Sequence, residues 1–347
     1  MLSRLKNFQV FLKDKNKKPP FVIAKELIHF GYVKKDLPVD YFRKYLYRKE
    51  VLDHTSYLTK KQYYSIIESP KILIPEIAMI LDNKLCFSWH AAQNQLPTPK
   101  LISYNVRHTY FYNSETYTIT NHKALAAFFI TVFTDTTQDA LFLKPIKGIG
   151  GKGCLVLEKA KLKEQILKHG DTLLTTSYIH QEKINQHPDI NVVHSNSVNT
   201  IRVNTYLDTE GKAHVLSALM RFGIGTSITD NTSAGGFFVA VNMEAGSLVG
   251  SGFQDLDKGG GVHGCHPDSK IILNGFKIPF LHETLELAKL ASLKTPTRII
   301  GWDIAIGNFG PIIVEGNTNP CLSMADIAYG GYCKHPLIKD ILKEINP

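Results

Sequence analysis

Two carboxylates towards the C-terminus are spaced as ligands of a divalent metal ion would be. Asp303 and Glu315 each lie in an apolar stretch. If the two stretches form a hairpin centred on Phe309, the carboxylates face each other at about 5 Å between Cβ atoms, and Asn317 points to the same side. Like charges so placed destabilise a hairpin unless a cation lies between them, and Mg²⁺ binds such oxygen ligands. Alternatively, one carboxylate faces solvent or pairs with an arginine such as Arg298.

A glycine-rich segment could bind the phosphates of a nucleotide. Residues 147–153 read Lys-Gly-Ile-Gly-Gly-Lys-Gly and lie between two apolar stretches. Glycine N–H groups can approach an anion closely, and Lys144, Lys147 and Lys152 add positive charge. The segment is neither a Walker A loop nor a dinucleotide fingerprint, because a strand rather than a helix is expected to follow it. On these residues alone, a polyphosphate site and a flexible hairpin tip are equally good interpretations.

Two arginines lie on neighbouring strands of a predicted hairpin. Arg202 alternates with Ile201 and Val203, so it occupies the polar face of its strand. Such an arginine can bind a carboxylate or a phosphoryl group in transfer. The strand pattern by itself favours a surface arginine on a half-exposed sheet, and Arg221 on the partner strand has the same two interpretations.

Hairpins that alternate with helices must position these residues. Helices are predicted at Glu76–His90, Ala124–Phe133, Ala160–His169 and Leu281–Lys294, with a few short helices before residue 70. Strands are predicted at Lys100–Val106, Ala140–Ile146, Gly153–Glu158, Leu173–Ile184, Thr200–Leu207, Ala213–Phe222, Arg298–Ile306 and Pro311–Glu315. The pattern indicates an α+β fold and excludes a doubly wound parallel sheet.

The positive charge is concentrated in residues 1–62. This segment holds 12 Lys and 3 Arg against 6 acidic residues, a net charge of 15 − 6 = +9, which equals that of the whole chain of 347 residues. The segment could contact an anionic surface, or it could be a solvated lysine-rich face that aids solubility. Nucleic acid is not an expected partner, because no recognised binding motif accompanies the charge.

Composition excludes several further classes of protein. The five cysteines form no CxxC pair, and His263, Cys265 and His266 fit no zinc spacing, so we interpret these three as loop residues. No apolar run reaches the roughly 20 residues needed to span a bilayer, and no apolar core follows the N-terminal charges as in a signal peptide. A cytoplasmic location is therefore expected.

Five segments in this order resemble the sugar-transfer-associated branch of the ATP-grasp superfamily. They are Asn199–Arg202, Asn231–Gly236, His266-Pro267, Gly301–Asp303 and Glu315–Asn317. The resemblance covers roughly residues 70–340 and implies an ATP-grasp fold, in which two α+β subdomains clasp ATP. The expected domains are a mainly helical, basic segment (1–70), a preceding region (71–123), a small subdomain with the glycine loop and hinge (124–190), and a large subdomain with the metal site (191–347).

The resemblance also implies roles for individual residues. ATP would be bound by a set that comprises Lys144, Lys147, Gly148, Gly150, Gly151, Lys152, Gln181, Glu182, Lys183, Ile184 and the ribose-binding Asp189. Mg²⁺ would be bound by Asp303, Glu315 and Asn317. Catalytic roles at the transferred phosphate would belong to Arg202, Lys152 and Arg221.

The implied activity is that of an ATP- and Mg²⁺-dependent, ADP-forming carboxylate–amine ligase. A carboxylate would form an acyl phosphate, and an amine would then displace phosphate to give an amide. The substrates would be a small-molecule carboxylate and amine, such as a sugar acid or an amino acid, in surface-polysaccharide biosynthesis. The alternatives are an ATP-grasp kinase acting on a sugar or polyol, and a non-catalytic nucleotide-binding subunit.

Overall fold

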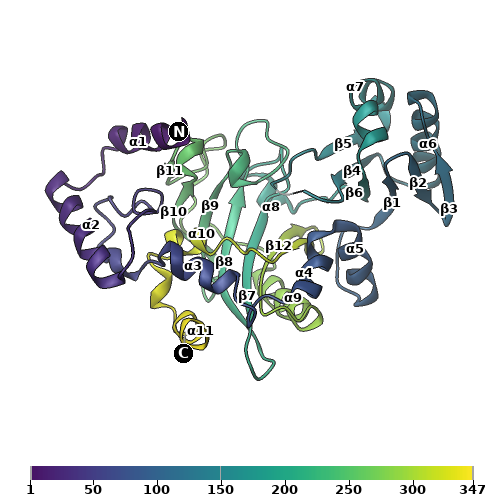
Figure 1. Ribbon diagram of the computed structural model, residues 1–347. Helices are drawn as coiled ribbons and strands as arrows, with labels where there is room; N and C mark the ends of the chain where they lie inside the picture. Colours follow the sequence, from purple (N-terminus) through teal and green to yellow (C-terminus); the bar gives the residue numbers. More distant parts are fainter. Residues whose placement is uncertain (1, 149, 346–347) are drawn as a thin grey trace. The chain divides into compact units, whose positions relative to one another are not determined.

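Two antiparallel sheets organise the chain, as the α+β prediction requires (Figure 1). The computed structural model describes residues 2–148 and 150–345. Unit 1 comprises the residues up to 78, residues 186–311 and those from 316 onwards, and unit 2 comprises residues 79–185 and 312–315. The four-domain division expected from the sequence stays a prediction.

The sheet of unit 1 is built around a hairpin whose bounds the sequence predicted to the residue, β7 (Thr200–Leu207) and β8 (Ala213–Phe222). The strand order is β11-β10-β9-β8-β7-β12-β13. The remaining strands are β9 (Phe237–Asn242), β10 (Ser247–Gln254), β11 (Val262–His263), β12 (Ile299–Gly307) and β13 (Gly310–Asn317). Strand β12 pairs with β7 in a register that sets Asp303 opposite Arg202.

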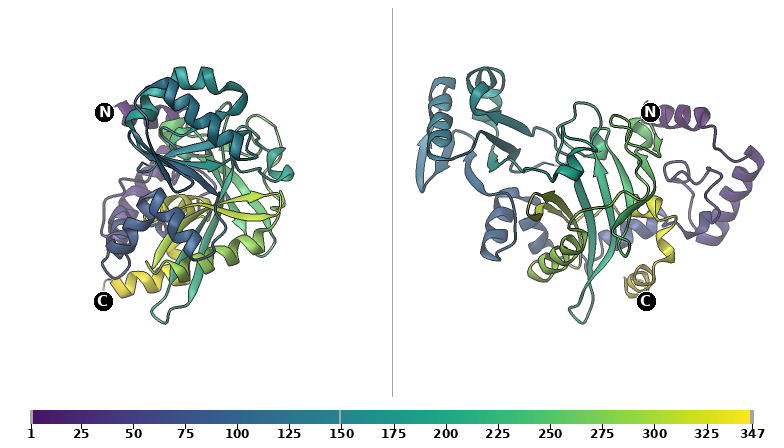
Figure 2. Two further views of the ribbon diagram at one scale, coloured as in Figure 1. Left: turned by 90° about the vertical axis from the view of Figure 1, so that its right-hand side faces the viewer. Right: turned by 180° about the vertical axis from the view of Figure 1, so that it is seen from behind.

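Helices cover both faces of this sheet. Helix α9 (Leu281–Lys294) packs against β7, β8 and β12 (Figure 2). On the other face, α10 (Leu322–Ala328), α3 (Lys60–Ile67) and α11 (Pro336–Ile345) share one apolar core with residues of β7, β8 and β9. Every residue of β7 except Leu207 is buried. The interpretation of Arg202 as a surface residue on a half-exposed sheet was therefore wrong.

The N-terminal segment belongs to unit 1. Its helices are α1 (Leu2–Lys13), α2 (Pro20–Lys34) and α3, with the short turn η1 (His54–Ser56) between them, in agreement with the predicted short helices. Four tyrosines of the segment lie in an apolar core, Tyr41, Tyr45, Tyr47 and Tyr57. Two of its lysines, Lys18 and Lys44, are buried and ion-paired. The segment is thus more than a solvated lysine-rich face.

Unit 2 has a six-stranded sheet of order β3-β2-β1-β6-β4-β5. Its strands are β1 (Leu101–Val106), β2 (Thr109–Tyr112), β3 (Glu115–Thr118), β4 (Ala140–Pro145), β5 (Leu155–Glu158) and β6 (Tyr178–Glu182). Helices α6 (His122–Asp135) and α7 (Leu162–Thr175) bury an aromatic-rich core against one face of the sheet.

Two predictions for unit 2 and its border were wrong. Residues 173–175 end helix α7 rather than begin a strand, because Leu173 and Leu174 fill the core beneath α6. The predicted helix over 76–90 is two helices, α4 (Pro75–Asp82) and α5 (Lys84–Gln93). They separate at Asn83, whose side-chain oxygen accepts bonds from the first N–H groups of α5 and so caps it. In the described parts of the chain, no helix is long and apolar enough to cross a membrane.

Candidate functional site

A buried ion pair lies at the centre of the sheet of unit 1. Arg202 Nε lies 2.5 Å from Asp303 Oδ1, and its Nη2 lies 3.0 Å from Asp303 Oδ2, so the guanidinium bonds both carboxylate oxygens. Both side chains are almost fully buried. The bidentate geometry follows from the strand register, which places the two residues directly opposite each other.

A second arginine and a second aspartate complete the cluster. Arg221 Nη2 lies 3.0 Å from Asp303 Oδ2 and 3.3 Å from Asp230 Oδ1. Asp230 Oδ2 accepts bonds from the backbone N–H and the hydroxyl of Thr200, at 2.8 and 2.5 Å. Burial raises the pKa of the Asp230 carboxyl. Two cations thus face two anions, which compensates the desolvation of each charge.

Asn317 and the backbone at Pro320 also belong to this cluster. Asn317 Nδ2 lies 3.4 Å from Asp303 Oδ2, and the carbonyl of Pro320 accepts a bond from Arg202 Nη1 at 3.2 Å. As an alternative to a metal site, the sequence suggested that one carboxylate pairs with an arginine such as Arg298. Asp303 does pair with arginines, but they are Arg202 and Arg221. Arg298 instead bonds Glu344, whose carboxyl pKa it lowers through this hydrogen bond.

Unit 2 holds the glycine loop between β4 and β5. Gly148, Gly150, Gly151 and Gly153 all have positive φ, between 69° and 144°, so the loop conformation requires glycine. Lys147 and Lys152 are exposed beside them. Ile149, within the predicted phosphate loop, lies outside the described residues.

Two lysines and a glutamate of unit 2 lie near this loop. Lys144, from β4, is buried and donates to the carbonyl of Val314 at 3.4 Å. Lys84 Nζ donates to the carbonyl of Gly148 at 2.8 Å and lies 4.0 Å from Glu315 Oε2. Lys84 was not predicted as a site residue. The usable signal was Asn83, which caps a helix that begins at Lys84.

Further residues that were predicted to bind ATP lie on the sheet face opposite α6 and α7. Phe142 pairs with Gln181 and Lys144 pairs with Ile179, so these four side chains share one face. Gln181 is buried, its Nε2 donates to the carbonyl of Pro99 at 3.2 Å, and its Oε1 has no hydrogen-bond partner among the described residues. A buried acceptor without a donor is costly, and a bound ligand could supply one.

The remaining residues predicted to bind the nucleotide lie at the end of β6 and after it. The backbone N–H of Glu182 donates to the carbonyl of Lys100, and its side chain accepts from the N–H of Lys100, so both groups are used in pairing β6 to β1. Lys183 and Ile184 continue from β6 without regular structure. Asp189, in the single turn α8 (Pro188–Asn191) of unit 1, is exposed beside His187.

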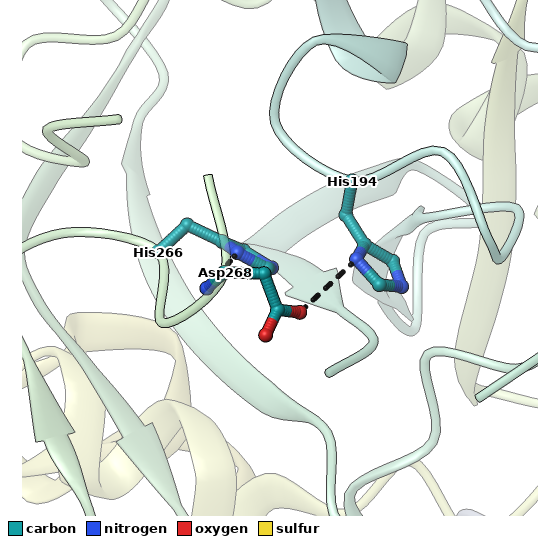
Figure 3. Close-up of side chains that lie close together, drawn as sticks. All are labelled: His194, His266 and Asp268. Carbon is teal, nitrogen blue, oxygen red and sulfur yellow. Dashed lines mark hydrogen bonds and ion pairs between the residues drawn. The ribbon is translucent and has the colours of Figure 1, made fainter. Parts of the chain in front are cut away.

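Unit 1 also contains a cluster of two histidines and an aspartate (Figure 3). His266 Nδ1 accepts from the backbone N–H of Asp268 at 3.1 Å, so its proton is on Nε2, which donates to the carbonyl of Gly223 at 3.0 Å. His194 stacks on His266 and lies 3.6 Å from the Asp268 carboxylate. Burial lowers the pKa of both imidazoles.

Backbone groups bond both ring nitrogens of His266. As long as these hydrogen bonds are present, at most two side chains of the cluster, His194 and Asp268, could bind a metal ion. The role of the cluster is structural. Asp268 Oδ2 also accepts from the N–H of Gly225, which fixes the segment that leads from β8 to Asp230. His266 is fully buried, so the interpretation as an ordinary loop residue missed its packing role.

The predicted site residues thus form two groups. Arg202, Arg221, Asp303 and Asn317 come together in unit 1, where Asp230 joins them. In the sequence, Asp230 opens a polar segment that could face a ligand or simply form a turn. Lys144, Glu315 and the glycine loop belong to unit 2, together with Lys84.

A family model decides the relationship of this chain to known proteins. The model, described as sugar-transfer associated ATP-grasp, matches residues 68–341. The chain belongs to this family. Its ATP-grasp fold agrees with the two antiparallel sheets described above. Among curated proteins, no sequence matches the chain.

Solved structures of low sequence identity resemble this ATP-grasp chain. The ATP-grasp ligase PsnB complexed with a minimal precursor is 14% identical with a TM-score of 0.43, over 79% of this chain and 62% of that one. D-alanyl-alanine synthetase A from Vibrio cholerae is 11% identical with a TM-score of 0.45, over 78% and 67%. D-cycloserine synthetase DcsG is 13% identical with a TM-score of 0.41, over 78% and 73%. The chain spans about three fifths of the length of PsnB.

Proposed function

We propose that this protein is an ATP- and Mg²⁺-dependent ligase that joins a carboxylate to an amine through an acyl phosphate. Membership of the ATP-grasp family supports the use of ATP. The observation that carries the proposal is the pair of buried guanidinium groups, Arg202 and Arg221, held against Asp303 in the central strands of unit 1. Arginines fixed in a site of low water content stabilise phosphoryl and carboxylate oxygens strongly.

The residues of unit 2 fit ATP. The acceptor Oε1 of Gln181, which is buried and has no partner in the part of the chain that the structure describes, suits the exocyclic amine of adenine. Phe142 and Ile179 share its sheet face. The positive-φ glycines and Lys144 suit phosphate oxygens. In this proposal Lys147 and Lys152 approach the phosphates from the loop, and the chain around Lys183 borders the adenine. Asp189, which is exposed, is the proposed ribose ligand.

Asp303, Glu315 and Asn317 would hold Mg²⁺, as the family resemblance implies. Their oxygen atoms are the hard donors that this ion prefers. Glu315 and Asn317 alternate along β13, while Asp303 already accepts bonds from both arginines and would share its carboxylate between them and the ion. When bound, Mg²⁺ would offset the negative charge of the phosphates and of the transferred group.

The proposed reaction has two steps. An oxygen of the substrate carboxylate attacks the γ-phosphorus, its O–P bond forms while the bond to the β-phosphate oxygen breaks, and ADP leaves. The amine then attacks the acyl carbon, the C–N bond forms, phosphate leaves with the C–O electron pair, and the amine proton passes to solvent. Arg202 and Arg221 would orient the phosphoryl group and stabilise its charge.

For the substrate class we propose a sugar acid, an amino acid or a related small molecule, within the cytoplasmic assembly of a surface polysaccharide. This assignment rests on the sugar-transfer association in the family description. No residue of the chain needs to become covalently attached to the substrate, because positioning and charge stabilisation are sufficient for this chemistry.

Product analysis tests the proposal. The purified protein would be incubated with Mg-ATP, a pool of sugar acids and amino acids, and hydroxylamine as a surrogate amine. The expected products are ADP, free phosphate and a hydroxamate. Glu315→Gln should remove this activity, while Glu286→Gln, a change of an exposed glutamate on α9, should retain it.

Two other outcomes would contradict the ligase. If phosphate stays attached to a hydroxyl compound and no hydroxamate forms, the protein is an ATP-grasp kinase. If ATP binds with normal affinity and no acid in the pool stimulates formation of ADP, a non-catalytic nucleotide-binding subunit becomes the better interpretation.

A further inference from the structure

Helix α2 turns an apolar face towards solvent. Phe21, Ile28 and Tyr32 are 74%, 75% and 84% exposed, and their spacings of seven and four residues place them on one side of the helix. Among the described residues, none packs over them enough to bury them. Leu37, three residues after the end of the helix, is 73% exposed. Several large apolar side chains are thus exposed close together in the sequence, which is unusual for a surface helix.

The opposite side of α2 is fixed to unit 1. Ile23 and Phe30 are buried in the core that contains the N-terminal tyrosines. Glu26, the one acidic residue of α2, is held on this side by a 2.8 Å ion pair with the buried Lys18 and by a hydrogen bond from Tyr41. The helix therefore cannot rotate to bury its outer face without breaking a buried ion pair.

The positive charge of the N-terminal segment indicates which kind of partner binds the outer side of α2. The outer side of α2 carries the exposed Lys25 and no acidic residue, and Lys35 directly follows the helix. Residues 1–62 as a whole have a net charge of +9. Exposed Phe, Ile and Tyr beside lysines are the combination that inserts into the boundary between lipid headgroups and acyl chains while binding anionic headgroups.

Two other kinds of partner fit the outer side of α2 less well. A second copy of the chain would bring two strongly positive segments together, and like charges repel. An acidic polysaccharide would satisfy the lysines but would leave Phe21 and Ile28 without apolar contacts. We infer that the outer face of α2, defined by Phe21, Ile28 and Tyr32, docks flat on an anionic lipid surface. This inference is independent of the ligase activity, because binding to lipid needs neither ATP nor an intact charged cluster.

Vesicle flotation tests the inference with the full chain and without nucleotide. The protein should float with vesicles of equal parts phosphatidylcholine and phosphatidylglycerol, should not float with phosphatidylcholine alone, and should be released by high salt. The triple variant Phe21→Ser/Ile28→Ser/Tyr32→Ser should lose at least tenfold in partitioning, because it removes three inserted apolar side chains. Lys25→Glu should weaken binding less.

The matched control is Leu167→Ser/Ile272→Ser, which removes two equally exposed apolar side chains outside the N-terminal segment and should bind like the wild type. Equal thermal unfolding of all variants would show that the fold is retained. Unchanged flotation of the triple variant, binding to neutral vesicles as strong as to anionic ones, or no flotation of the wild type would each overturn the inference. Light scattering that detects a dimer in the wild type but not in the triple variant would assign the face to self-association.

Discussion

At the scale of single residues, Asp303 is the carboxylate that pairs with both arginines of the candidate site. It accepts bonds from Arg202 and Arg221 while almost fully buried. Replacing a carboxylate that compensates two buried guanidinium groups leaves their charge partly unpaired. We therefore expect Asp303→Asn to lower the free energy of unfolding of unit 1 by about 3–5 kcal/mol. Urea unfolding followed by the fluorescence of the buried Trp302, in a Trp89→Phe background, measures this change.

Glu315→Gln provides the comparison for that measurement. The side chain of Glu315 is 29% exposed and lies 4.0 Å from Lys84, so its neutralisation should change stability by less than about 1 kcal/mol. Equal stability of the two variants would contradict the structural role of Asp303. For assays of activity, Glu315→Gln is the cleaner variant, because loss of turnover in Asp303→Asn would combine two effects.

Lys84 gives a second prediction at this scale. Its ammonium group holds the carbonyl of Gly148 at 2.8 Å, so Lys84→Met should loosen the glycine loop. A hydrogen bond from a charged donor contributes about 1.5–3 kcal/mol, and we expect the KM for ATP to rise roughly tenfold or more. Steady-state kinetics would be compared with Lys123→Met, an exposed change on α6. An unchanged KM would show that the loop does not depend on this bond.

The sequence identified most of the charged residues of the site but not their pairing. The strands that carry Arg202 and Asp303 are far apart in sequence, and only the sheet order places them opposite each other. A hairpin argument can align neighbouring stretches, whereas the register of β7 against β12 depends on the whole sheet. For the same reason, the sequence could not show that Arg298 pairs with Glu344 and not with a carboxylate of the candidate metal site.

At the scale of elements, the histidine of β6 makes unit 2 sensitive to acid. His180 is fully buried, its Nδ1 lies 2.8 Å from Ser103 Oγ and its Nε2 lies 3.2 Å from Asn105 Oδ1. Burial lowers its pKa from 6.5 to about 3. Between these values the unfolded chain binds a proton that the folded chain does not, so the stability of unit 2 should fall as pH decreases below 6.5.

The measurement is the unfolding of unit 2 between neutral and acid pH, followed by the fluorescence of Trp89 in a Trp302→Phe background. His180→Gln should flatten the dependence on pH, although it should also lower stability at neutral pH because the site is tightly packed. His108→Gln, at an exposed position before β2, should leave the dependence as in the wild type. A wild-type slope in His180→Gln would assign the acid sensitivity to other groups.

Predictions of elements succeeded where hydrophobic patterns and turn residues agreed. The β7–β8 hairpin and helix α9 were predicted to the residue, since each has a clear period and a clear end. The end of α7 was mistaken for strand because Leu173–Thr176 combines apolar and β-branched residues, and its packing under α6 decides the conformation. The short β2–β3 hairpin is rich in Tyr and Thr and lacks the alternation that would have revealed it.

At the scale of the whole molecule, a buried ion pair joins the N-terminal segment to the rest of unit 1. Lys44 Nζ lies 2.6 Å from Asp326 Oδ2 in α10, and Asp326 also accepts from the N–H groups of Leu58 and Tyr332. Lys44→Met would leave this carboxylate buried without its cation. We expect a loss of about 3–5 kcal/mol in the stability of unit 1, measured by urea unfolding.

Lys49→Met, an exposed change in the same segment, should be neutral in that experiment. If Lys44→Met proves equally neutral, the segment is an appendage that contributes little to unit 1. The sequence alone could not distinguish these cases, because an excess of lysine describes both a solvated surface and a segment with a few buried, paired lysines. Only the partner, 282 residues away, reveals the role of Lys44.

The pairing of Lys44 with Asp326 also sets an order of events during synthesis. Unit 2 uses a continuous stretch from residue 79 to 185 and needs only four later residues, so most of it can fold while the ribosome is still translating unit 1. Unit 1, in contrast, needs both its earliest and its latest segments, and the first 78 residues must wait for α10 to emerge. During that interval Lys44 lacks the carboxylate that neutralises it in the folded protein.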